Sequence, residues 1–353
     1  MSILEEYTNR SMWLTKLITA VEAYLPGDTV ASSLLLFAAA PYVLATTIIY
    51  LAGSPDGYFP LVLLLGATSA ALGPALIWHF DQNVFPTFLE EVAEIVTQAK
   101  KDELRKTVEY YEQFFHDRYW LVMVPWGVLL VGAVVINKGF FRSIGIPTYT
   151  HPAFLVTLVF SVWWAVVTGI VLHGGVTGIL CVRDVADLEL VIDPLHPDGL
   201  GGLSTIGYFS IRTTLMNSVT SLTLPLGFAI ASEGGYQNVV YFAVFVYIGF
   251  LLVSFVYPTF YVNRRAQAVR ETTLEKRREQ IRTLEENMDM HGSATSATAD
   301  LNAQLQLQSL RDDFREHKEV NLYPLSVSIL TRLATSILLP ITFTLLEAYV
   351  FSG

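Results

Sequence analysis

Residues 152–178, PAFLVTLVFSVWWAVVTGIVLHGGVTG, decide the fold because they contain no Asp, Glu, Lys or Arg. A helix needs about 20 consecutive apolar residues to cross the hydrocarbon core of a bilayer, and this stretch exceeds that length. The rest of the chain has a matching composition, since 52% of its 353 residues are hydrophobic and only 15% are charged. Soluble domains carry about 25% charged residues. The sequence therefore predicts an all-α membrane protein.

Further apolar stretches bring the predicted number of transmembrane helices to seven. Charged residues bound these stretches, which cover 29–55, 57–80, 119–137, 213–232, 234–263 and the run after Arg332, broken only by Glu347. The predicted organisation is an amphipathic surface helix within 1–28, spans 1 and 2 within 29–80, a helical segment at 81–118, spans 3 and 4 within 119–182, a loop at 183–212, spans 5 and 6 within 213–263, a helical hairpin at 264–322 and span 7 within 323–353.

The distribution of basic residues predicts the orientation of the chain. Of its 22 Lys and Arg residues, 20 fall in segments that one threading places on the same side of the membrane. The two exceptions are Lys138 and Arg142. Because loops rich in Lys and Arg stay in the cytoplasm, we expect a multi-pass protein of the cell membrane with a cytoplasmic N-terminus and an extracytoplasmic C-terminus.

Charge and cysteine content narrow the possible partners. The net charge is −10, and acids outnumber bases in the predicted cytoplasmic segments, which argues against nucleic acid and against a polybasic patch for anionic lipid. The single cysteine, Cys181, excludes an internal disulfide and a multi-thiolate metal site. We expect the lipid bilayer as a partner, with an ion or small solute and a second copy of the chain as further candidates. No cofactor is predicted.

The charged segment 81–118 is predicted to be a long cytoplasmic helix with one apolar face. Pro86 stops any helix that precedes it, and Thr87 and Glu90 have the spacing of a capping box. A helix should therefore begin there, and it should break in two near residues 100–102.

The charged segment 264–320 is predicted to be an antiparallel helical hairpin. Apolar residues recur at helical spacing on both sides of a small polar stretch, 292–298, which forms the tip. The apolar residues follow a heptad spacing, as in a coiled coil, but three or four sustained repeats are needed to establish one and this segment has fewer.

Two similar pentapeptides indicate an internal repeat. Residues 84–88 are VFPTF and residues 256–260 are VYPTF, and each stretch lies at the inner end of a predicted span and introduces a charged helical segment. The pattern predicts a 3+1+3 arrangement, in which spans 1 to 3 and spans 5 to 7 are parallel copies and span 4 connects them. Parallel repeats of this kind are a known transporter layout.

Spans 5 and 7 are unusually rich in polar side chains. The residues that could line a hydrated pathway between the two halves are Asn217, Thr220, Thr223, Arg332, Thr335 and Ser336. Hydroxyl groups in a membrane can instead donate to a carbonyl of their own helix or to a neighbouring helix. Arg332 either reaches the inner surface or faces the bundle, where it would pair with an anion or with Asp81.

The loop before span 5 holds the densest group of residues that could carry chemistry. Its candidates for a metal or anion site are Asp193, His196, Asp198, Gly201, Gly202 and Ser204. Carboxylates and an imidazole could bind a hard or borderline metal, and backbone N–H groups of the glycine run could bind an anion. The alternative is a rigid proline turn whose glycines allow close packing.

The same loop carries a resemblance to known sequences. Leu195-His196-Pro197-Asp198, followed by Gly201-Gly202-Leu203, resembles an inner-loop motif of uncharacterised prokaryotic multi-pass membrane proteins. The spacer here, Gly199-Leu200, departs from the small and charged residues common in that motif. The resemblance implies no activity.

Three functions remain compatible with the sequence. The first is a transporter or ion channel, which the internal repeat and the polar residues of spans 5 and 7 favour. The second is a membrane scaffold or signalling protein that binds a partner through its charged cytoplasmic helices. The third is a membrane enzyme that uses the loop 193–204, although no known catalytic motif occurs in the chain.

Overall fold

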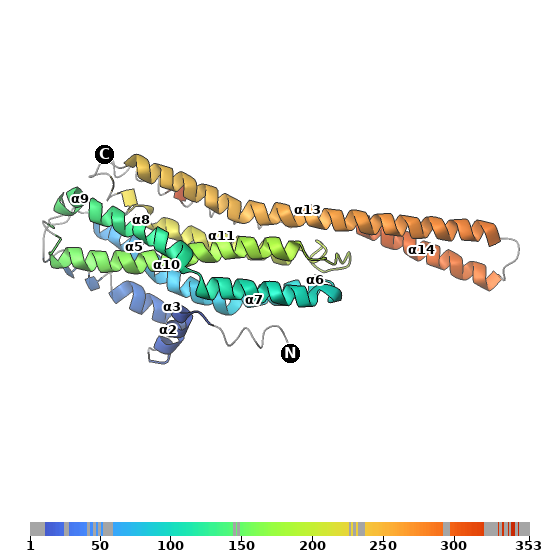
Figure 1. Ribbon diagram of the computed structural model, residues 1–353, viewed down its shortest axis with the longest axis horizontal. Coiled ribbons are helices and arrows are strands. Elements are labelled where there is room, and N and C mark those ends of the chain that lie inside the picture. The colour runs from blue at the N-terminus through green and yellow to red at the C-terminus, as the bar shows by residue number, and fades with distance from the viewer. Residues whose placement is uncertain are drawn as a thin grey trace.

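The computed structural model describes residues 11–24, 28–40, 59–143, 149–225, 237–291 and 297–320, together with isolated positions between and after these ranges. The regular elements of these residues are helices, and one isolated bridge joins Val96 to Leu190. Figure 1 shows a bundle of elongated helices, from one end of which a two-helix arm projects. The chain is therefore all-α, as its composition predicts.

Three helical segments among the described residues are long and apolar enough to cross a membrane. They are Gln98–Ile136, Pro152–Ala186 and Asn238–Met288. The chain thus has the helices of a multi-pass membrane protein. The bounds of the bundle helices are α2 (Trp13–Glu22), α3 (Thr29–Leu34), α5 (Phe59–His79), α8 (Trp120–Ile136), α9 (Lys138–Ser143), α10 (Pro152–Ala186) and α11 (Ser204–Ser218). π-Helical turns at Leu35–Ala39 and Phe80–Val84 follow α3 and α5, and a 3-10 turn at Val219–Thr223 follows α11.

The number of seven spans stays a prediction. Helices α5, α8, α10 and the first half of α13 (Gln237–His291) lie where spans 2, 3, 4 and 6 are predicted. Span 7 and much of span 1 fall outside the described residues.

Helix α10 forms the centre of the bundle. It contacts α5, α8, α11, α13 and α7 (Lys101–Asp117). Glycines allow this close packing: a Cβ at Gly73 of α5 would lie 2.1 Å from Val167 Cγ1, and one at Gly169 of α10 would lie 2.7 Å from Met123 Cα of α8. Small residues let membrane helices approach each other in this way.

The segment 81–118 differs from its prediction at both ends of its first helix. Backbone geometry stays helical before Pro86, because α6 (Phe85–Ile95) continues directly from the π-helical turn Phe80–Val84. The wider turn tolerates a residue without an N–H group. No side chain caps α6.

The break in this segment lies at Val96, which is extended, and precedes the predicted position. The reason is a tertiary contact: Thr97 N–H donates to Glu189 O at 3.1 Å, and Val191 N–H donates to Ile95 O at 2.7 Å. These bonds attach the loop 187–203 to the end of α6.

The arm consists of the charged half of α13 and of α14 (Ala297–Glu319), which pair along the predicted hairpin. Helix α13 has 55 residues and is about 80 Å long at 1.5 Å per residue. Ion pairs join the two helices, with Arg277 Nε 2.8 Å from Asp313 Oδ2 and Arg311 Nη2 2.6 Å from Glu285 Oε1. The arm is visible as the long pair of helices in Figure 1.

The two copies of the repeat motif have different local structures. Residues 84–88 span the junction between a π-helical turn and α6, whereas residues 256–260 lie inside α13 with Pro258 in its interior. The parallel repeat therefore stays a prediction that rests on sequence position.

Candidate functional site

The predicted loop 193–204 folds around the carboxylate of Asp198. Asp198 Oδ1 accepts hydrogen bonds from the N–H groups of Leu200 at 2.8 Å and Gly202 at 3.1 Å. Its Oδ2 accepts from the N–H of Ser204, the first residue of α11, at 3.1 Å. Asp198 therefore caps α11 and occupies the position at which the sequence suggested an external anion.

The electrostatics of Asp198 follow from these donors. Burial alone would raise the pKa of the carboxyl group, but the N–H groups of Leu200 and Gly202, together with the hydroxyl and N–H of Ser204, lower the pKa of Asp198 to about 2. His196 Nδ1 lies 2.8 Å from Asp198 Oδ1. A carboxylate held in its charged form by several fixed donors acts here as a structural group.

The glycines of the loop are needed for its shape. Gly201 and Gly202 have φ angles of 67° and 91°, which side chains with a Cβ rarely adopt. A Cβ at Gly202 would lie 2.6 Å from Ile95 Cγ2, and one at Gly201 would lie 2.8 Å from Ile192 Cγ2. The loop thus packs tightly against the end of α6.

The structure brings Asp193, His196 and Asp198 into one loop but not into a metal-binding cluster. Asp193 Oδ1 accepts from the N–H of Leu195 at 2.9 Å, within its own turn. Among the described residues, no group of three or more His, Cys, Asp or Glu side chains is placed to hold a metal ion. A role of this loop in binding or catalysis stays a prediction.

The predicted pathway residues are only partly described. Arg332, Thr335 and Ser336 lie outside the described residues. In the described part, Thr213 and Thr214 of α11 donate to carbonyls four residues earlier, and Thr223 donates to Thr220 O at 2.6 Å. These hydroxyls are buried and donate to carbonyls of their own helix. This arrangement matches the predicted alternative to a hydrated pathway, in which the hydroxyl groups are satisfied by backbone carbonyls.

Asn217 is an exception in this region. Its side chain is buried, and Nδ2 donates to Thr213 O at 2.9 Å, whereas Oδ1 has no hydrogen-bond partner in the part of the chain that the structure describes. A Cβ at Gly175 of α10 would lie 2.5 Å from Asn217 Nδ2, so α10 and α11 are in close contact here. Asn217 therefore lies between helices and not on an open surface.

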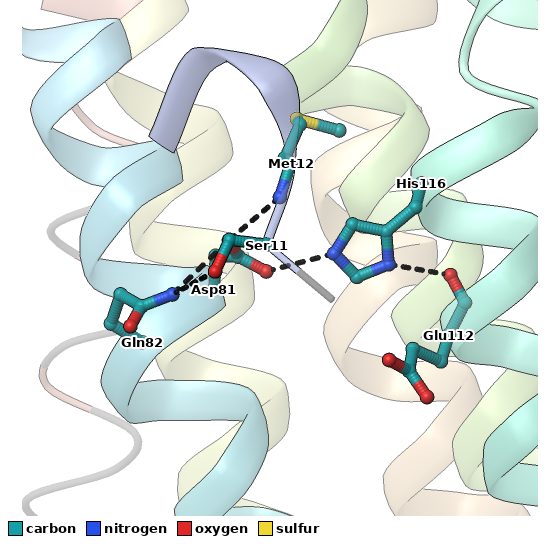
Figure 2. A network of polar contacts seen from close by, with 6 residues as sticks. All are labelled: Ser11, Met12, Asp81, Gln82, Glu112 and His116. Carbon is teal, nitrogen blue, oxygen red and sulfur yellow. Dashed lines mark hydrogen bonds and ion pairs between the residues drawn. The ribbon is translucent and has the colours of Figure 1, made fainter. Parts of the chain in front are cut away.

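A buried ionic cluster that sequence reasoning missed lies where α5 ends (Figure 2). Asp81 is fully buried in the π-helical turn, and its Oδ1 lies 3.1 Å from Nε2 of His116 on α7. Asp81 Oδ2 accepts from the backbone N–H of Met12 at 3.2 Å and from Gln82 Nε2 at 3.4 Å. The cluster thus joins the N-terminal segment, α5 and α7.

The hydrogen bonds of His116 define its protonation. Nδ1 lies 2.7 Å from the backbone oxygen of Glu112, which can only accept, and Nε2 faces a carboxylate, which accepts when ionised. The ring must therefore donate through both nitrogens unless Asp81 carries the proton. In both cases the pair carries one proton more than a neutral His116 beside an ionised Asp81, and this proton lies in a site that is shielded from water.

The sequence contains a weak signal for this pair. Asp81 is the first charged residue after the apolar window 57–80, and His116 lies three residues before the window 119–137. Both windows meet the same predicted membrane boundary, so their ends could be expected to approach each other. Which residue would pair with Asp81 depends on the packing of α7 against the bundle, which the windows do not reveal.

Comparison with known proteins assigns the chain to no family. No protein-family model, no curated protein and no solved structure matches the chain.

Proposed function

We propose that the chain is a membrane-embedded docking protein, whose helical bundle lies in the bilayer and whose α13–α14 arm binds a protein partner in the cytoplasm. The observation that carries the proposal is the continuity of α13, which runs without interruption from its apolar half into its charged half. A continuous helix of this kind couples the position of the arm to that of the bundle.

The base of the arm is fixed in the bundle core. Val262 and Ala266 of α13 are fully buried in the main hydrophobic cluster, which also contains residues of α6, α10 and α11. Arg270 Nη1 donates to Val320 O at 3.3 Å, which ties α13 to the end of α14. The arm is therefore held at its base by packing and along its length by ion pairs.

The far part of α14 offers a contact surface. Leu301 and Leu305 are 55% and 56% exposed and lie one helical turn apart, so they face the same side. Leu307, Leu310 and Phe314 instead lie on the side that packs towards α13, where Phe314 lies under Arg278. Two exposed leucines on an otherwise charged arm suit a partner that presents an apolar groove.

A photo-crosslinking amino acid at Leu305 is expected to capture a distinct protein in native membranes, because this side chain faces away from α13. The adduct should have a larger mass than the chain alone, and its mass should differ from that of a dimer of the chain. Mass spectrometry should identify one partner protein in it. Glu279 of α13 is the matched control, since it is exposed on the same arm. Position 279 should give little or no adduct.

Deletion of residues 271–318 completes this test. The captured partner should leave the membrane fraction when the arm is deleted, while Cys181, buried in the bundle core, stays protected from maleimide. Adducts that contain only a second copy of the chain, or an unchanged amount of membrane-bound partner after the deletion, would rule out the docking function.

A second candidate is a transporter or channel whose activity depends on a proton, and the Asp81–His116 pair favours it. Ionisable groups buried in membrane proteins are costly and commonly mark proton or ion paths. The groups around the pair come from several elements: Met12 and Thr15 of the N-terminal segment and His116 of α7 face Asp81, and Glu112 of α7 faces His116. In this function the path would lie between the two predicted halves.

Proteoliposomes separate this candidate from the first. Ion or solute flux should change with pH in the wild-type protein, and Asp81→Asn should remove that dependence because the amide keeps the hydrogen-bond geometry without the charge. The measurement is uptake across a panel of ions with an imposed pH gradient. Absence of flux for the whole panel in wild-type vesicles would eliminate transport and leave the docking proposal untouched.

A further inference from the structure

A groove on α13 lies beside the charged half of the helix and has no role in the functions proposed above. Its volume is about 740 Å³, and the described residues that line it all belong to α13. Leu252, Val253, Val256 and Phe260 form its apolar wall. From Leu252 to Arg264 the helix rises about 18 Å, which is close to the thickness of one leaflet of the hydrocarbon core.

The groove ends at two polar side chains. Asn263 is 8% exposed, and its Oδ1 is buried without a hydrogen-bond partner among the described residues. Arg264 is exposed, lines the groove and forms no hydrogen bond or ion pair within the part of the chain that the structure describes. A buried amide oxygen that lacks a donor is costly, so its presence beside an unpaired guanidinium points to a polar ligand.

The position of these side chains identifies the kind of ligand. Arg264 is the first charged residue after the apolar window 234–263, so it lies at the level expected for phosphate groups of the predicted inner leaflet. An Arg binds phosphate through its planar set of N–H donors, and an Asn amide offers both a donor and an acceptor. A phosphate ester with hydroxyl groups satisfies both side chains.

We propose that this groove is a binding site for an anionic phospholipid, whose acyl chain lies along Leu252, Val253, Val256 and Phe260 and whose phosphate binds Arg264 next to Asn263. The acidic composition of the predicted inner face argues against a broad polybasic patch, and a site with one unpaired Arg does not need one. The lipid neutralises Arg264 and fills an apolar surface that continues into the bilayer.

The adjacent arginine provides a matched control. Arg265 forms an ion pair with Asp187, and its Nη2 donates to Tyr261 Oη at 3.2 Å. It also lies 5.5 Å from the centre of the Tyr261 ring. Arg265 is therefore engaged within the protein, so that Arg264→Gln and Arg265→Gln remove the same charge from neighbouring positions with different surroundings.

The experiment is native mass spectrometry of the purified full-length chain with phosphatidylglycerol and phosphatidylcholine. We expect one phosphatidylglycerol to bind in preference to phosphatidylcholine, and Arg264→Gln to weaken its binding about fivefold or more. Arg265→Gln should bind it as the wild type does. Equal binding by wild type and Arg264→Gln, with Cys181 still protected from maleimide, would overturn the proposal.

A second variant separates a phospholipid from a free anion. Val256→Trp narrows the apolar part of the groove and leaves Arg264 in place, so it should weaken phosphatidylglycerol binding. Inorganic phosphate at 100-fold excess should not displace the lipid, because phosphate lacks the acyl chain. Displacement by phosphate, or full binding of phosphatidylglycerol by Val256→Trp, would show an anion site without a lipid function and would refute the assignment.

Discussion

Replacement of Asp81 by alanine is expected to destabilise the protein by about 3–5 kcal/mol, because it removes one partner of a buried pair and takes away the carboxylate that faces Nε2 of His116. Asp81 is fully buried and His116 has 10% of its side chain exposed, so water cannot replace the lost carboxylate. The backbone N–H of Met12 loses its acceptor in the same change. The N-terminal segment should therefore detach from α5 before the bundle unfolds.

The measurement uses Cys181, which is the single cysteine of the chain and is fully buried in the bundle core. The temperature at which maleimide labels Cys181 should fall strongly in Asp81→Ala and less in Asp81→Asn, whose amide still accepts from Met12. Asp81→Ala combined with His116→Ala should cost less than the sum of the two single changes, since the partners interact directly. Strict additivity would contradict the ion pair.

The helices of the bundle could be predicted because lipid imposes a simple rule on the sequence. A charge-free window of sufficient length is expected to become a helix, and most of α10 and the first half of α13 lie within such windows. The hairpin of the arm could be predicted as well, since its apolar residues recur at helical spacing up to Phe314. These signals are local and need no knowledge of packing.

The position of the break in 81–118 could not be predicted, because its cause lies in a distant segment. Val96 is extended on account of its bridge to Leu190, which is 94 residues away in the sequence. The continuity of α13 through Pro258 is a second case, since a proline ordinarily marks a possible helix end. In both cases tertiary packing overrides the local signal.

The candidate sites show the same limit. The residues of the loop 193–204 were recognisable, but composition does not reveal that Asp198 uses the backbone donors itself. The Asp81–His116 pair joins two residues that are 35 positions apart. From the sequence alone, each would be interpreted as an ordinary polar residue at the end of a predicted span. Residue types indicate what chemistry is possible, and only the packing decides which groups meet.

Replacement of Gly169 by alanine is expected to destabilise the protein by about 1–3 kcal/mol through overpacking of two helices. The new Cβ would lie 2.7 Å from Met123 Cα and 3.1 Å from Met123 Cβ. The atom in closest approach belongs to the backbone of α8, so rotation of a side chain cannot relieve the contact. Helices α8 and α10 must move apart, which disturbs the hydrogen bond from Trp126 Nε1 to Thr168 Oγ1 at 2.8 Å.

Gly132→Ala is the matched control, because Gly132 lies on α8 and a Cβ there would meet no atom within 4 Å. Alanine also restricts the unfolded backbone, so this change should be neutral or stabilise the helix by up to about 1 kcal/mol. Labelling of Cys181 against temperature should therefore shift down for Gly169→Ala and stay or shift up for Gly132→Ala. Equal shifts would mean that helix propensity alone governs both positions and that α8 and α10 do not approach each other at Gly169.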